Sequence, residues 1–233
     1  MEKVSATTRS YSSGDKIKEK ITEGSIIKVI EANTQVAEVV KTIEGLTIKC
    51  RISMGPREDW KINTGIRSFD KMLHMFAQYS RLNLNINVEA KSLKSTCWLI
   101  GNIGKTLGEV LNIMARERSK TVGMKAFGYS QGLYEEAFAE IRILLTGNGG
   151  CWITRGQSVK AFGRIGEVPE EALKLFFTEF AQAIKGTLHI DLIRGESPYT
   201  LWYAVLIAFG EALRQAFTED EWNKKPISVE PFT

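Results

Sequence analysis

The two halves of this 233-residue chain repeat one pattern, and the repeat constrains the fold more than any other feature of the sequence. Phe76-Ala77-Gln78 recurs as Phe180-Ala181-Gln182, in both cases just before a stretch of alternating apolar residues. Leu107-Gly108-Glu109 likewise corresponds to Phe209-Gly210-Glu211. Each half therefore reads as strands, a helix, a further strand and a second helix, with the split near residues 119–125.

Apolar residues recur with the period of a helix in four segments and with the period of a strand in several others. The helical segments are 68–78, 99–116, 169–184 and 197–209. The strand-like segments are 46–52, 82–88, 138–145, 151–154 and 187–193. Because each half has one apolar sheet face to bury, we expect an α+β fold of duplicated half-domains. Each half-domain is an antiparallel sheet plus two helices, and the helices are sandwiched between the two sheets.

Turn residues indicate how some of these segments connect. The stretch 24–40 is rich in β-branched residues around a turn-like centre at 31–34 and predicts a hairpin. Residues 60–63 follow a Gly-Pro turn and are expected to pair with the strand at 46–52. Gly147-Asn148-Gly149-Gly150 predicts a tight strand connection rather than a phosphate-binding loop, since no helix follows it.

The repeat divides the chain into an N-terminal extension, two half-repeats and a C-terminal tail. We expect the extension to be partly disordered, because its first 15 residues are polar and rich in Ser and Thr and read as a flexible tail. The four parts are 1–40, 41–120, 121–218 and 219–233.

The counts of soft ligands limit the chemistry of the chain. With only His74 and His189, a site built mainly from imidazoles is excluded. The three scattered cysteines do not form a disulfide framework, which indicates a reducing, cytoplasmic environment. No apolar stretch approaches the roughly 20 residues of a membrane helix, so no membrane contact is expected. The net charge of +4 permits nucleic-acid binding without indicating it.

Several segments resemble one enzyme family. The segment 64–73, Thr-Gly-Ile-Arg-Ser-Phe-Asp-Lys-Met-Leu, resembles the Thr-Gly to Asp-His-Met-Leu segment of imidazoleglycerol-phosphate dehydratase, an enzyme of histidine biosynthesis. Segments 107–109, 187–191 and 208–216 fall in register with the same family. The match runs from about residue 45 to 217 and implies a ribosomal protein S5 domain 2-like fold. It also implies a homo-oligomer built from trimers.

The resemblance implies a reaction that needs two divalent metals, usually manganese, held by histidines and glutamates at subunit contacts. In this chain those ligand positions fall on other residue types. They are Lys71, Cys97, Trp98, Gly101, Leu175, Tyr199, Thr200 and Tyr203. Two arginines of the family's phosphate contacts fall on Ala126 and Asn148. One thiol cannot supply a metal site, so we expect no metal, no cofactor and no family reaction.

Two interpretations of the altered positions stay open. Lys71, Cys97, Trp98, Tyr199 and Tyr203 could line a remade pocket for a planar or anionic small molecule. Alternatively, the aromatic side chains, with Trp202 among them, fill the old metal pocket and hold subunits together.

Three functional hypotheses follow. The first is a dehydratase-like protein that has lost the reaction and serves a structural, regulatory or ligand-binding role. The second is a metal-independent enzyme on the same scaffold, a lyase if active, with Lys71, Cys97, Tyr199 and Tyr203 as the groups to test. The third is a nucleic-acid-binding module that uses the basic stretch at 116–125, although a solvated connector explains that stretch better. Nucleic acid is therefore an unlikely partner.

Overall fold

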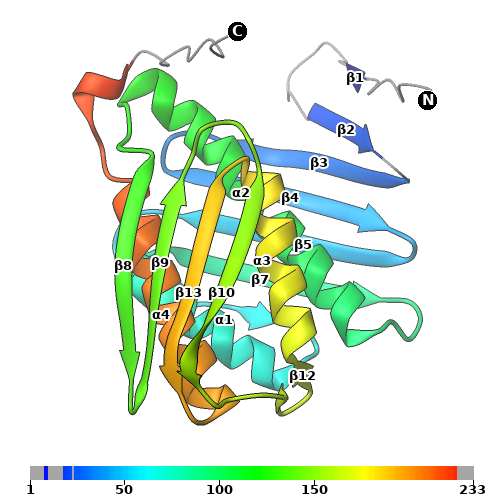
Figure 1. Cartoon of the computed structure of the whole chain (residues 1–233). Coiled ribbons are helices and arrows are strands. Elements are labelled where there is room, and N and C mark those ends of the chain that lie inside the picture. The colour runs from blue at the N-terminus through cyan, green and yellow to red at the C-terminus, as the bar shows by residue number, and fades with distance from the viewer. Residues whose placement is uncertain (1–7, 10–17, 23, 225–233) are drawn as a thin grey trace, which may run out of the picture.

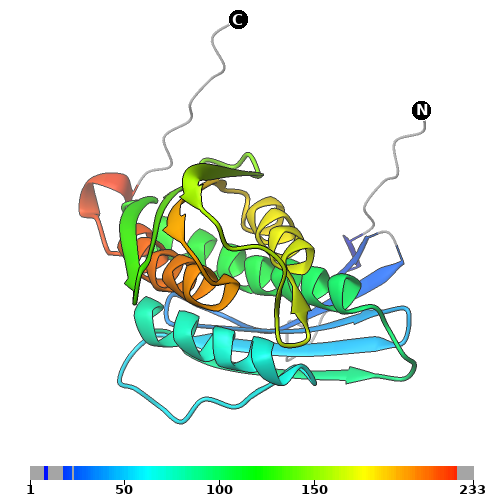
Figure 2. The same ribbon diagram turned by 60° about the horizontal axis from the view of Figure 1, so that its bottom comes forward.

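Two β-sheets enclose the helices in the computed structural model, which describes residues 8–9, 18–22 and 24–224 (Figures 1 and 2). The first sheet has seven strands in the order β1-β2-β3-β4-β5-β7-β6. These strands are Thr8–Arg9, Lys18–Thr22, Ser25–Ala32, Val36–Ile43, Leu46–Ser53, Asn83–Ala90 and Ile62–Asn63. The second sheet has the order β10-β13-β9-β8. Its strands are Gly150–Val159, Thr187–Gly195, Ala137–Leu144 and Phe127–Tyr134.

Four helices form the layer between the sheets. The helix α1 (Arg67–Ser80) packs against α4 (Pro198–Ala216), and α2 (Thr96–Thr121) packs against α3 (Glu170–Ile184). Both contacts join one half-repeat to the other (Figure 2). The expected α+β fold, with helices sandwiched between two sheets, is thus confirmed. A short ribbon of β11 and β12 precedes α3, and a 3₁₀ turn, η1, follows α4; their bounds are Arg164–Ile165, Val168–Pro169 and Glu221–Lys224.

Neighbouring strands are antiparallel apart from two pairs in the sheets. The strand β6 runs parallel to β7, and β10 runs parallel to β13. The second pair is connected through α3, so β10, α3 and β13 form a β-α-β unit. A parallel pair needs such a crossover because a tight hairpin reverses the chain direction.

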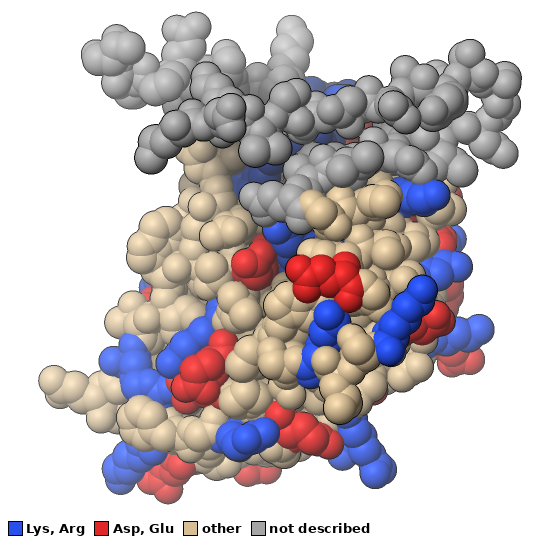
Figure 3. Space-filling view, turned by 90° about the vertical axis from the view of Figure 1, so that its right-hand side faces the viewer, with Lys and Arg blue, Asp and Glu red and all other residues tan. Residues whose placement is uncertain are grey.

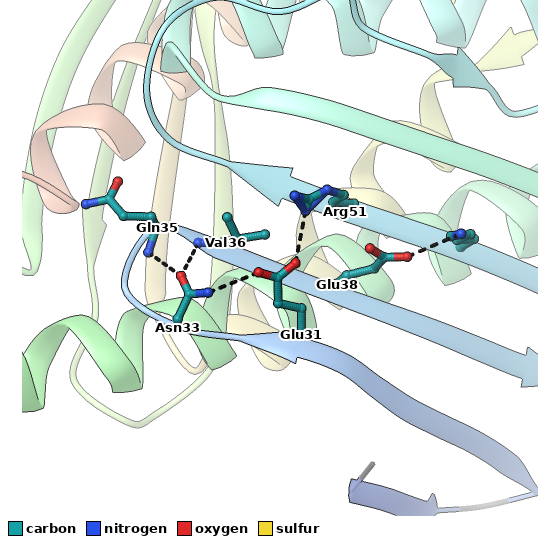
Figure 4. A network of polar contacts seen from close by, with 7 residues as sticks. Glu31, Asn33, Gln35, Val36, Glu38 and Arg51 are labelled. Carbon is teal, nitrogen blue, oxygen red and sulfur yellow. Dashed lines mark hydrogen bonds and ion pairs between the residues drawn. The ribbon is translucent and has the colours of Figure 1, made fainter. Parts of the chain in front are cut away.

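The hairpin expected at 24–40 is formed by β3 and β4. Its turn is closed by Asn33, whose Oδ1 accepts hydrogen bonds from the backbone N–H groups of Gln35 and Val36 at 2.9 and 2.7 Å (Figure 4). The Asn33 amide also donates to Glu31, which in turn accepts from Arg51 on β5. Asparagine is favoured at such a position because its side chain can bond the backbone of the turn it occupies.

The prediction that residues 60–63 pair with the strand at 46–52 is wrong. The strand β6 pairs with β7, because β5 already has β4 and β7 on its two sides. Asparagines on the outer side of β7 hold the segment in place. Asn85 accepts from the Lys61 N–H at 2.8 Å, and Asn87 accepts from the amide of Asn63 at 3.1 Å.

The glycine-rich turn at 147–150 connects β9 to β10, but these strands are not neighbours. The strand β13 lies between them and pairs with both. The turn is therefore short, as expected, yet it does not close a hairpin. Insertion of a later strand between two earlier ones is a long-range pairing that a local turn pattern does not reveal.

The strand β8 has no counterpart among the predicted strands. Its inward positions are Gly128, Ser130 and Gly132, which give no apolar alternation. The helix α4 explains the glycines, since a Cβ at Gly132 would lie 1.9 Å from the carbonyl oxygen of Ala204. The close approach of α4 therefore requires glycine on the inner side of β8. These glycines remove the apolar alternation by which a strand is recognised in a sequence.

The proposed division of the chain is only partly covered by the described residues. Most of the tail expected at 1–15 lies outside them, and its described part, Thr8–Arg9, pairs with β2 as strand β1. Residues 25–40 belong to β3 and β4 of the large sheet. The boundaries at 40, 120 and 218 stay predictions. Within the described residues, the helices are too short or too polar to cross a membrane.

A buried lysine lies between the first sheet and the helices. Lys41 on β4 is 1% exposed, and its Nζ lies 3.7 Å from Oε2 of Glu109 on α2. Burial lowers the pKa of Lys41, and the nearby Glu109 carboxylate opposes this shift only in part. The charged form of Lys41 is therefore less stable in the folded chain than in the unfolded chain.

This lowered pKa gives a pH-dependent test. Below its ordinary value of 10.5, the unfolded chain binds a proton at Lys41 more strongly than the folded chain does. The free energy of unfolding should therefore rise with pH toward 10.5 in the wild type relative to Lys41→Met. Urea unfolding at several pH values between 8 and 10.5 measures the difference. Lys49→Met, on the neighbouring strand, should keep the wild-type slope, and an unchanged slope in Lys41→Met would contradict the assignment.

Candidate functional site

The five predicted site residues come from three helices. Lys71 lies on α1 and is exposed, whereas Cys97 and Trp98 lie half-buried in the first turn of α2. Tyr199 and Tyr203 lie one turn apart at the start of α4, the first 43% exposed and the second buried. All five therefore lie in the first or second turn of a helix. A neighbouring chain or a ligand could reach the exposed ones, Lys71 and Tyr199.

A cluster of three tyrosines forms at the start of α4. The rings of Tyr199 and Tyr203 have centroids 4.3 Å apart, and Tyr134 at the end of β8 lies 5.9 and 5.3 Å from them. Burial raises the pKa of Tyr203, and interaction with the Tyr199 hydroxyl raises the pKa of Tyr134. Both shifts favour the neutral phenol at Tyr203 and Tyr134. Sequence reasoning missed Tyr134 because it lies on the strand that has no visible alternation.

Glu136 fixes the start of α4 beside this cluster. Its Oε1 accepts hydrogen bonds from the Thr200 hydroxyl at 2.6 Å and from the N–H of Glu196 at 3.1 Å. The Thr200 bond contributes most to a lowered pKa of Glu136, which favours the ionised form. A carboxylate at a helix N-terminus is stabilising because the helix dipole is positive there. Thr200, at a position of a family ligand, is thus engaged within its own chain.

The other predicted residues are not joined to the tyrosines. Among the described residues, no hydrogen bond, ion pair or ring contact links Lys71, Cys97 or Trp98 to the tyrosine cluster. Trp98 instead lies beneath the ammonium group of Lys94, whose Nζ is 4.9 Å from the ring centroid. A ligand site made from all five residues therefore stays a prediction.

Two further positions of the implied metal site do face each other. Gly101 on α2 lies against Leu175 on α3, and a Cβ at Gly101 would be 2.8 Å from Cδ2 of the leucine. By the resemblance, these are the positions of a glutamate and a histidine ligand. Here the contact is apolar and closely packed, and it offers no atom with a lone pair for a metal.

The residues at the implied ligand positions do not fit a pair of manganese ions. Lys71 carries a positive charge, and Gly101, Leu175 and Trp98 have no oxygen, sulfur or imidazole donor. Within the part of the chain that the structure describes, His, Cys, Asp and Glu form no group of three or more that could hold a metal ion. The mismatch lies in the chemistry of the side chains, and no step of a metal-dependent reaction can be derived from them.

A polar cavity of about 610 Å³ opens next to the start of α4. Its lining residues are Glu136, Gln157, Ser158, Lys160, Arg194 and Glu196. None of the five predicted residues lines it. Lys160 and Glu196 pair across its rim at 3.7 Å, so the charges of this cavity are partly satisfied by one another.

The remaining candidates have structural roles. Arg118, in the basic stretch, is buried and donates to the backbone oxygen of Thr34 at 2.9 Å while pairing with Glu219. The Arg118 side chain therefore holds α2 in the fold and is not available to bind a nucleic acid. Figure 3 shows acidic side chains interspersed with the basic ones on the visible face.

The three cysteines are free, and burial raises the pKa of Cys151 to about 12, which keeps its thiol protonated.

Both histidines lie beside tryptophans. The ring of His74 is 5.8 Å from that of Trp60, and the ring of His189 stacks on Trp152 with centroids 5.1 Å apart. His189 is exposed, whereas His74 is half-buried. No hydrogen bond, ion pair or ring contact within the described residues joins either histidine to an implied ligand position, although His74 lies one turn from Lys71 on α1.

Comparisons with known proteins agree with the resemblance. A family model described as imidazoleglycerol-phosphate dehydratase matches residues 64–213. The imidazoleglycerol-phosphate dehydratase of Hydrogenovibrio crunogenus is 28% identical over 184 residues, which cover 77% of this chain and 91% of that protein. The structure of the Staphylococcus aureus enzyme superposes with a TM-score of 0.66 at 24% identity, covering 79% of this chain and 99% of the other. The Pyrococcus furiosus enzyme gives 0.67 at 23% identity, covering 78% and 94%.

The contact between α2 and α3 gives a matched pair of stability predictions. A Cβ at Gly104 would lie 2.4 Å from the backbone oxygen of Phe176, which cannot move without shifting α3. Gly104→Ala should therefore lower the free energy of unfolding by about 2–3 kcal/mol. At Gly101 the obstacle is the end of the flexible Leu175 side chain, so Gly101→Ala should change it by less than about 1 kcal/mol. Urea unfolding measures both, and equal losses would contradict the packing described.

Proposed function

We propose that this chain, which belongs to the imidazoleglycerol-phosphate dehydratase family, retains the scaffold of the family without its two-metal chemistry. In this proposal it is a pseudoenzyme with a structural, regulatory or ligand-binding role. The observation that carries the proposal is the pairing of Gly101 with Leu175, which puts a tight apolar contact where the resemblance implies two metal ligands.

Charge and donor chemistry support the same proposal. A divalent ion binds where several deprotonated ligands are held in fixed geometry. An ammonium such as that of Lys71 repels a dication at short range. Burial raises the pKa of Tyr203, so its phenol stays neutral at physiological pH and is a poor ligand for a hard cation in that state.

Self-association is the second part of the proposal. The resemblance implies a trimer-based homo-oligomer, and without metals the subunits would be held by apolar and aromatic contacts in the cytoplasm. The exposed ring of Tyr199, backed by Tyr203 and Tyr134, is a surface of the kind that subunit contacts use. The same cluster is where a planar small molecule would stack if the protein binds one.

The contacts give less support to a metal-independent enzyme. A nucleophile needs a base within hydrogen-bond reach, and the described contacts bring neither Lys71 nor a histidine to Cys97. The tyrosines lie against each other rather than around the polar cavity. We therefore retain one proposal, the loss of the family reaction.

An activity assay tests the proposal. The purified full chain is incubated with imidazoleglycerol phosphate and excess Mn²⁺, beside the H. crunogenus relative as a positive control. We expect no product above a protein-free blank, because the ligand positions cannot hold the metals. A kcat/KM within about tenfold of the control would contradict the proposal. The triple variant Lys71→Ala/Cys97→Ala/Tyr199→Phe separates true turnover from a contaminant, since contaminating activity would survive it unchanged.

A further inference from the structure

We infer that the outer face of the four-stranded sheet is a self-association surface on which a second copy of this chain packs face to face. We call it the β8–β10 face and define it by the outward side chains of β8, β9, β13 and β10. The described elements leave it uncovered, toward the viewer in Figure 1, while α3 and α4 cover the other side of the sheet. The inference deepens the proposed assembly, because it names a contact that needs no metal.

One row of side chains crosses the whole face. Strand registers place Tyr129 beside Arg142, Arg142 beside His189, and His189 beside Trp152. The Arg142 guanidinium lies 5.4 Å from the centroid of the Tyr129 ring, and the rings of His189 and Trp152 stack at 5.1 Å with an angle of 14°. The row is thus held in one arrangement by contacts within the chain, which reduces the entropy lost on binding a partner.

Large, exposed side chains lie at both ends of that row and in the row beside it. Trp152 is 53% exposed, Phe127 is 51%, Leu144 is 40% and Tyr129 is 37%. Phe127 and Leu144 are cross-strand neighbours in the adjacent row. Aromatic residues and arginine are the types enriched at the centres of protein interfaces, and contiguous exposed apolar surface usually marks a binding site.

The charges on the face favour a protein partner over a nucleic acid. Arg142 pairs with Asp191 on the next strand and with Glu140 at 2.9 Å, and Glu140 also accepts from Gln131. The central guanidinium is therefore already neutralised by two carboxylates. Phosphates would meet those carboxylates and be repelled, whereas a second copy brings the same balanced charges and the same aromatic side chains.

A twofold axis parallel to the strands brings the β8–β10 face of one copy against the same face of a second copy. Such an axis sets β8 opposite β10 of the second copy, so that the Tyr129 ring lies opposite the partner's Trp152 in the same row. Closed twofold contacts use one patch twice and do not extend into fibres. Strand spacings of about 4.8 Å and rises of about 3.4 Å give a face of roughly 500 Å² per copy. A pair buries about 1,000 Å², which predicts a concentration-dependent contact rather than a permanent one.

Sedimentation velocity of the full chain from 1 to 100 µM tests the inference. We expect the wild type to shift with concentration toward species of at least twice the mass of the one present at 1 µM, whether that species is a single chain or the proposed trimer. The variant Tyr129→Thr/Trp152→Thr should keep the smaller mass at every concentration, since threonine suits a strand but removes both rings. Ile30→Thr, at an outward position of the other sheet with 49% exposure, is the matched control and should behave as the wild type.

Several outcomes would overturn the inference. One is a wild type whose mass does not change over this range, and another is a double variant that doubles in mass as the wild type does. If the double variant does not fold, as judged by circular dichroism and thermal unfolding, Leu144→Lys on the same face replaces it. Binding of a single-stranded oligonucleotide that the double variant loses would assign the face to nucleic acid and also overturn the inference. None of these results depends on metal or turnover, so the proposed loss of activity stands or fails separately.

Discussion

The close packing of α2 against α3 is the contact on which the rest of the structure depends. At Gly104 and Gly108 the α2 backbone touches backbone oxygens of α3, where a Cβ would lie 2.4 and 2.5 Å away. The two helices belong to different half-repeats, so their contact sets how the two sheets face each other. It also determines which positions of the two halves meet, because a helix so closely packed cannot rotate to present another side.

In the proposed function, a few side chains differ from the family's ligands while this packing stays the same. One turn before Gly104, Gly101 meets Leu175. Whatever residues occupy these two positions must face each other, as a metal-ligand pair in the implied family site or as an apolar contact here. Helix packing therefore holds the two halves of one chain together, and the proposed loss of the metal ligands leaves this packing intact. The fold is shared with the Staphylococcus aureus enzyme, while the site is argued from the residues themselves.

The sequence predicted the elements whose own pattern is strong and missed those that depend on distant partners. The helices around Phe69 and Phe176 and the strand at 187–193 were evident from periodicity alone. The strand β8 was not, because α4 requires Gly128 and Gly132 to replace its apolar residues. The pairing of residues 62–63 with β7 depends on side-chain amides across the sheet, which no local pattern encodes.

The candidate site shows the same division. The resemblance gave Gly101 and Leu175 as two of the implied ligand positions, and in the structure these residues lie in contact. It did not show that Tyr134 joins Tyr199 and Tyr203, because that residue comes from the unpredicted strand. Nor did it reveal the β8–β10 face, because the outward side chains of a sheet follow no periodic rule that sequence reasoning can use.

The central claim is that side chains at the implied ligand positions cannot hold divalent metal. Equilibrium dialysis of the metal-free chain against Mn²⁺, followed by elemental analysis of metal per chain, tests it most directly. The account predicts a manganese content indistinguishable from that of a protein without a metal site, and unchanged by Cys97→Ala. Saturable binding of about two manganese ions per chain would contradict it.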